Sequence, residues 1–121
     1  MKKHVVLFGH GSRASGSDLA IRAVARDLGQ RTGWEVLVAH MELAKPSLPE
    51  VVRSLVQKGI RSVSVVPYFL HVGIHLREDI PALLDGIRAE HPGLQLVLTE
   101  PLGYDPSLAQ ILEDRVREAA A

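Results

Sequence analysis

Residues 60–87 read IRSVSVVPYFLHVGIHLREDIPALLDGI, a stretch with a strand pattern, a loop and a helix pattern in direct succession. Residues 60–67 contain the apolar run Ser-Val-Ser-Val-Val, which predicts a buried strand. The helix pattern is a set of apolar residues at helical spacing: Ile80, Leu83, Leu84 and Ile87. His71 and His75 stand between the two patterns. This order predicts one unit of a parallel α/β fold with histidines on the loop that follows its strand.

The same alternation runs through the rest of the chain. Strands are expected at residues 4–9, 35–39, 60–67 and 94–99, all of them short and largely apolar. Three further apolar stripes predict helices after the first, second and fourth strands: Ile21, Val24, Ala25 and Leu28; Val51, Val52 and Leu55; Leu108, Ile111, Leu112 and Val116. The sequence therefore predicts a single domain over residues 1–121. Its fold class is α/β, with three α/β/α layers and a four-stranded parallel sheet.

Local signals predict where the helices begin and end. Gly33 and Gly59 are expected to end the first two helices. The third helix is expected to start at Asp79-Ile80-Pro81. Two residue pairs have the spacing of a capping box, in which a hydroxyl and a carboxylate or amide satisfy the first backbone N–H groups: Ser47 with Glu50, and Ser107 with Gln110.

Composition excludes several classes of function. The 121 residues carry 14 Lys plus Arg and 14 Asp plus Glu, so no basic excess predicts binding to nucleic acid or to an anionic membrane. The absence of cysteine excludes disulfides, thiolate zinc sites and iron–sulfur clusters. The apolar run near the N-terminus is too short for a signal sequence or a membrane span. We expect a soluble protein in the cytoplasm.

The first predicted strand ends in Gly9-His10-Gly11-Ser12-Arg13. The two glycines let the backbone turn sharply around His10, and Ser12 and Arg13 predict an anion-binding corner at the start of the first helix. An alternative is that His10 merely caps a backbone group. The glycine spacing is not a dinucleotide fingerprint, and no Gly-Lys-Ser/Thr of a P-loop follows. Ligands of open parallel sheets bind beyond the carboxyl ends of the strands, which favours a functional role for this loop.

The loop with His71 and His75 is expected at the same edge. Neutral imidazole binds divalent first-row metals, and near pH 7 it also accepts a proton. Gly73 disfavours a continuous helix through both histidines, so His75 is the preferred ligand and His71 is alternatively a surface residue. Glu42 follows the second strand and offers a carboxylate to this edge, although an exposed glutamate is usually only solvated.

Taken together, these motifs resemble the class II tetrapyrrole chelatases, and in particular the short CbiX-type sirohydrochlorin chelatases. The resemblance covers essentially the whole chain. Four segments carry it: His10-Gly11-Ser12-Arg13, Pro46-Ser47-Leu48-Pro49, Pro67-Tyr-Phe-Leu-x-x-Gly-x-His75 with Asp79-Ile80-Pro81, and Pro101-Leu102-Gly103.

The resemblance implies a lyase-class enzyme that inserts a divalent metal into sirohydrochlorin, on the route to cobalamin, sirohaem or coenzyme F430. Co²⁺ is the first expectation for the metal substrate, with Ni²⁺ and Fe²⁺ as alternatives, and no permanently bound cofactor is expected. Longer relatives have two lobes around one cleft, so a chain with the length of one lobe implies a homodimer.

By motif position, His10 and His75 are the expected catalytic and metal-binding residues. Glu42 and His71 are the less certain metal ligands. The residues expected to contact the substrate are Gly11, Ser12, Arg13, Leu70 and Gly73. The residues also leave two other functions open. One is a metal- or tetrapyrrole-carrying protein without catalysis, and the other is a phosphoryl- or acyl-transfer enzyme that uses the first loop as its anion site.

Overall fold

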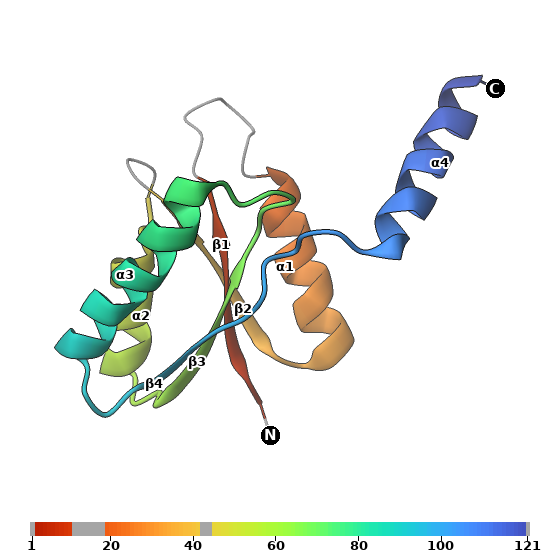
Figure 1. Ribbon diagram of the computed structural model, residues 1–121. Coiled ribbons are helices and arrows are strands. Elements are labelled where there is room, and N and C mark those ends of the chain that lie inside the picture. Colours follow the sequence, from red (N-terminus) through yellow and green to blue (C-terminus); the bar gives the residue numbers. More distant parts are fainter. Residues whose placement is uncertain (1, 11–18, 42–44, 121) are drawn as a thin grey trace.

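The computed structural model describes residues 2–10, 19–41 and 45–120, without the side chains of His75 and Ala120. Strands and helices alternate along the chain (Figure 1). In order, the elements are β1 (His4–Gly9), α1 (Leu19–Thr32), β2 (Glu35–His40), α2 (Leu48–Gln57), β3 (Ser62–Pro67), α3 (Ile74–Glu90), β4 (Gln95–Leu98) and α4 (Pro106–Ala120).

The four strands form one sheet in the order β2-β1-β3-β4, and every pair is parallel. This arrangement confirms the predicted α/β fold class with a four-stranded parallel sheet. At the carboxyl ends of the strands, Gly9 of β1 lies beside His40 of β2, and Phe8 lies beside Pro67 of β3. The loops that follow β1, β2 and β3 therefore leave the sheet at one edge.

Helices cover the two faces of the sheet unequally. Helices α2 and α3 lie on one face, and α1 lies on the other (Figure 1). Alternate residues of β1 fill the two cores, since Val6 and Phe8 pack with α2 and α3 while Val5 and Leu7 pack with α1. This double burial is why the strand patterns are almost wholly apolar.

The predicted ends of α1 and α2 are confirmed. Gly33 and Gly59 have positive φ angles of 77° and 88°, a conformation that costs glycine little. Helix α2 begins with a complete capping box. The Glu50 backbone N–H donates to the Ser47 hydroxyl at 3.4 Å, and the Ser47 N–H donates to the Glu50 carboxylate at 2.9 Å.

The predicted start of α3 is wrong by five residues. The helix begins at Ile74, after Gly73 in an extended conformation, so Pro81 lies inside it. Leu76 packs against the larger core and holds this additional first turn in place. Proline lacks the N–H that would bond to the Arg77 carbonyl and is best tolerated in the first turn of a helix, which is why the sequence pattern suggested a start at Asp79-Ile80-Pro81 instead.

The predicted capping box of α4 is also wrong. The helix begins at Pro106, and the Ser107 N–H donates to the Asp105 carboxylate at 2.8 Å. The Gln110 side chain instead bonds to Asp114 at 3.0 Å. The aspartate stands directly before a proline at the first helical position, and this pair makes the stronger cap. The carboxylate accepts from a free backbone N–H of the first turn, and the proline has no N–H that needs a partner.

Helix α4 projects away from the rest of the fold (Figure 1). Its apolar residues Ile111, Leu112 and Val116 are exposed. None of the helices in the described ranges is long and apolar enough to cross a membrane.

Candidate functional site

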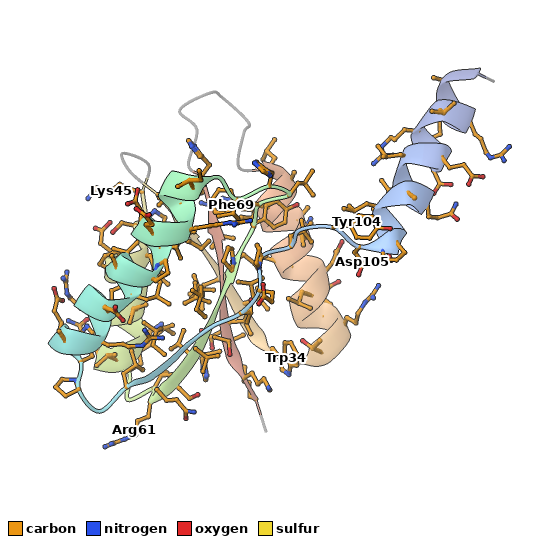
Figure 2. The ribbon with its side chains drawn as sticks, in the orientation of Figure 1. Trp34, Lys45, Arg61, Phe69, Tyr104 and Asp105 are labelled. Atoms are coloured by element: carbon orange, nitrogen blue, oxygen red, sulfur yellow. The ribbon has the colours of Figure 1, made fainter. Side chains whose placement is uncertain are left out.

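The carboxyl ends of β1 and β3 place His10 beside the loop that follows β3. The Tyr68 N–H donates to the Phe8 carbonyl at 2.8 Å and so continues the pairing of the two strands into this loop. The next residue, Phe69, packs edge-on against Phe8, with ring centroids 6.5 Å apart. It also packs edge-on against His10, with centroids 6.4 Å apart. Phe69 thus joins the buried core to an exposed histidine at this edge (Figure 2).

Gly9 lets the end of β1 pass closely beneath α1. A Cβ atom at this position would lie 3.0 Å from the Ile21 Cδ1 atom, closer than nearly all real contacts. A side chain at position 9 would therefore force the end of the Ile21 side chain to shift by a few tenths of an ångström, and glycine avoids this crowding. His10 itself is solvent-exposed.

The loop between β3 and α3 presents its side chains outward. Leu70 is 64% exposed and His71 is also exposed. Gly73 is the N-cap of α3, with φ −71° and ψ 174°, and its carbonyl accepts from the Arg77 N–H at 3.0 Å. His75 lies in the first turn of α3, whereas His71 precedes the helix. The two histidines therefore do not lie together on one face of a helix. Their separation was predicted from Gly73, which stands between them.

A groove of about 500 Å³ opens between this loop, α3 and the end of β4. Its polar lining includes the basic side chain of Arg77, the imidazole of His71 and the acidic residue Glu100. The remaining lining residues are Pro67, Leu70, Val72, Leu76, Ile80, Pro81, Leu98, Thr99 and Pro101. The groove therefore combines an apolar wall with a cationic group, an arrangement that suits a largely apolar ligand that carries a carboxylate.

Other predicted site residues lie outside the described residues. They are Gly11, Ser12 and Arg13 after β1, and Glu42 after β2. Among the residues that the structure does describe, no three His, Asp or Glu side chains are grouped to hold a metal ion.

His40 is a residue at this edge that the sequence interpretation left without a role. It is 5% exposed at the end of β2, and its Nδ1 atom has no hydrogen-bond partner within the described ranges. His40 is in phase with Val36 and Val38, which pack on the α1 side of the sheet. The alternation of residues along the strand was the sequence signal for the burial of His40, because it places the imidazole on a covered face of the sheet.

The chain is similar in sequence to known proteins of one family. A family model described as CbiX matches residues 4–119. The sirohydrochlorin cobaltochelatase of Methanothermobacter thermautotrophicus is 35% identical over 95% of this chain and 91% of that protein. The chloroplastic sirohydrochlorin ferrochelatase of Arabidopsis thaliana is 34% identical over 93% of this chain but only 51% of its own length.

A solved structure shares the fold. The crystal structure of a putative cobalamin biosynthesis CbiX protein from Marinobacter aquaeolei VT8 superposes with a TM-score of 0.84, at 33% identity. The match covers 99% of this chain and 96% of that one. These similarities confirm the resemblance inferred from the sequence motifs.

Proposed function

Because this chain belongs to the CbiX family, we propose that it is a chelatase that inserts a divalent metal ion into sirohydrochlorin. Two relatives at 34–35% identity support this substrate, since both are named for sirohydrochlorin. Their names differ in the metal, cobalt in one and iron in the other. We propose Co²⁺ as the metal and cobalamin as the end product, because the match covers 91% of the cobalt relative but only 51% of the iron relative.

The observation that carries the proposal is the meeting of two histidine-bearing segments at one edge. His10 directly follows β1, His75 lies in the first turn of the helix that follows β3, and these strands are neighbours. Metal insertion removes two pyrrole N–H protons while the hydrated metal ion loses its water. A neutral imidazole holds the ion weakly and accepts a proton near pH 7. We assign both roles to His10 and His75, with Glu42 and His71 as auxiliary metal ligands.

Sirohydrochlorin bears several carboxylates that the protein has to bind. Guanidinium groups bind carboxylates through paired hydrogen bonds. Arg77 of α3 and Leu70 both line the groove. We propose that Arg77 holds one end of the macrocycle together with Leu70 and Gly73, and that Gly11, Ser12 and Arg13 hold the other.

The size of the chain supports a homodimer. It spans about half the length of the Arabidopsis relative, and a groove of about 500 Å³ is small for a tetrapyrrole. We propose that two copies together form the complete cleft. The cytoplasmic location stays a prediction.

Insertion is tested by mixing the purified protein with sirohydrochlorin and Co²⁺, Ni²⁺ or Fe²⁺ in turn, and following the visible spectrum. We expect at least one metal to be inserted faster with the protein than without it, and Co²⁺ fastest. Absence of acceleration with every metal would overturn the chelatase proposal. Binding of the tetrapyrrole without insertion would identify a carrier protein instead.

The roles of the histidines are tested by His10→Ala and His75→Ala. Because a positioned acid or base contributes about a hundredfold or more to rate, each substitution is expected to slow insertion by that order. His4→Ala is the matched control, since His4 lies at the opposite end of β1. Equal rates in the His10→Ala variant and the control, with both folded, would remove His10 from the mechanism, and the same comparison applies to His75.

A further inference from the structure

Glu100 is an acidic residue of the groove to which the proposed function gives no role. It follows β4 directly, and the Thr99 N–H donates to the Val65 carbonyl at 3.0 Å, so the chain continues beside β3 past the end of β4. Side chains alternate between the two faces along such an extended segment. Glu100 is therefore in phase with Leu96 and Leu98, which pack in the core that α3 covers. This phase explains why Glu100 lines the groove beside α3.

The segment with Glu100 is tied to the loop with His71. Two backbone hydrogen bonds of 2.9 Å join them: from the Leu102 N–H to the Pro67 carbonyl, and from the Gly103 N–H to the Phe69 carbonyl. His71 follows two residues after the second of these bonds, and it lines the same groove. The fold therefore presents an imidazole and a carboxylate to one volume of about 500 Å³.

Both side chains are available to a ligand. His71 and Glu100 are exposed, and within the described ranges neither side chain takes part in a hydrogen bond or an ion pair. Imidazole nitrogen and carboxylate oxygen are both ligands of divalent first-row metals. No third His, Asp or Glu of the described residues completes a metal site with them. Two protein ligands leave most coordination positions to water, so such a site holds a hydrated ion loosely and releases it readily.

Arg77 is the remaining ionisable side chain of this groove, and its charge opposes a metal ion. Its guanidinium is exposed, and it has no carboxylate partner in the part of the chain that the structure describes. A positive charge beside a site lowers the affinity of that site for a divalent cation. A substrate carboxylate bound to Arg77 neutralises this charge. The groove is thus better suited to a metal ion after the tetrapyrrole has bound than before.

We propose that His71 and Glu100 capture the hydrated metal ion in this groove after a tetrapyrrole carboxylate has bound to Arg77. The inference rests on the proposed function, to which it adds a metal-binding residue, Glu100, and an order of binding. His71 then acts with Glu100 before insertion, and the ion passes from them to His10 and His75. Because the charge of Arg77 repels the ion until the macrocycle is bound, the metal is admitted only when its acceptor is present.

Titration with Co²⁺ alone tests the capture site without insertion. Co²⁺ is paramagnetic and perturbs the NMR signals of nearby amides, so the signals of Val72 and Thr99 report on the groove that both residues line. Removing one positive charge beside a divalent ion is expected to tighten binding in Arg77→Gln by about three- to tenfold. Adding Glu100→Gln to this variant should abolish the gain. Adding Glu78→Gln should preserve it, because Glu78 is exposed on α3 and does not line the groove.

Two results of this titration would overturn the inference. One is an affinity for Co²⁺ in Arg77→Gln that equals that of the natural chain, which would show that Arg77 does not control the metal. The other is a gain that survives Glu100→Gln, which would show that the carboxylate does not bind the ion.

The insertion assay separates this inference from the proposed function. Loss of even an outer-shell partner of a metal ligand costs about tenfold or more in metal affinity, so Glu100→Gln is expected to raise the KM for Co²⁺ by about tenfold with little change in kcat. Glu78→Gln should keep both values. An active natural chain whose KM is unchanged by Glu100→Gln would refute the capture site alone. A chain with the expected Co²⁺ titrations that inserts no metal would refute only the proposed activity.

Discussion

At the scale of single residues, Phe69 connects stability to the candidate site. Its ring contacts buried Phe8 on one side and exposed His10 on the other. An edge-to-face pair of rings contributes about 0.5–1.5 kcal/mol beyond simple burial, and it also orients both rings. If His10 acts as proposed, Phe69 is therefore a positioning residue for it, because Phe69 would act on the chemistry through another side chain.

Phe69→Leu tests this positioning. Leucine retains the apolar contact with Phe8 but has no ring to orient His10, so we expect insertion to slow by about two- to tenfold. The readout is the insertion rate, measured beside the free energy of unfolding so that lost positioning is separated from lost stability. Phe69→Tyr retains the ring and is expected to restore most of the rate. A leucine variant with the insertion rate of the natural chain would contradict the assignment.

Gly9 is the other residue whose identity is fixed by contact. An added Cβ would lie 3.0 Å from the end of the Ile21 side chain, which can move by a small amount but not withdraw from the core. We expect Gly9→Val to destabilise the fold by about 1–3 kcal/mol through overpacking, and Gly9→Ala to cost less. Chemical denaturation of the three proteins measures the difference. Equal stability of Gly9→Val and the natural chain would show that α1 is not held closely at this point.

At the scale of elements, the start of α2 makes stability depend on pH. The Ser47 backbone N–H, which donates to the Glu50 carboxylate, holds the pKa of Glu50 below its ordinary value of 4.5, with lesser contributions from the Ser47 hydroxyl and Lys45. A lowered pKa in the folded state means that the charged form favours folding. This contribution is present above pH 4.5 and is lost as the pH falls through the folded pKa.

Glu50→Gln is accordingly expected to lower the Tm near neutral pH, with a gap that narrows in acid. Thermal unfolding followed by circular dichroism at about pH 7 and about pH 3 measures the gap. Glu90→Gln serves as the control, because the exposed Glu90 carboxylate takes part in ion pairs, with Arg53 at 3.7 Å and with His91 at 4.0 Å, rather than in a helix cap. A gap of equal size at both pH values would mean that the Glu50 charge does not support the cap.

Ser47→Ala removes the other half of the same cap. The loss of an N-cap hydroxyl costs about 1 kcal/mol, and we expect a decrease of that order in the free energy of unfolding. Urea denaturation near neutral pH measures it. Ser107→Ala is the informative comparison, because the hydroxyl of Ser107 does not cap α4, whose first turn is bonded to Asp105 instead. A larger loss at Ser107 than at Ser47 would reverse the assignment of the two caps.

The elements were predictable where two independent signals agreed. Strand β1 is apolar throughout and ends at a glycine, and α2 has both a capping box and a terminal glycine. The start of α3 could not be predicted, because Pro81 signals a helix start locally while the packing of Leu76 that extends the helix is tertiary. The cap of α4 was misassigned for a related reason, since Ser107 and Asp105 both have capping side chains and only the geometry decides between them.

At the scale of the whole molecule, the sheet edge was predictable and the placement of α4 was not. Parallel strands end at one edge, so His10 and the loop after β3 had to meet there once four strands were expected. The apolar stripe of α4 says only that the helix needs a partner. Whether that partner is its own sheet or another molecule depends on the bonds of Leu102 and Gly103 to the loop after β3, and no local pattern reveals them.

The proposed homodimer makes thermal stability depend on protein concentration. The free energy of association stabilises the folded chains by mass action, so dilution favours unfolding. We expect the Tm of the natural chain to rise steadily as the chain concentration increases from about 1 µM to about 100 µM. A Tm that does not change over this range would contradict the homodimer, and it would mean that each chain is stable without a second copy.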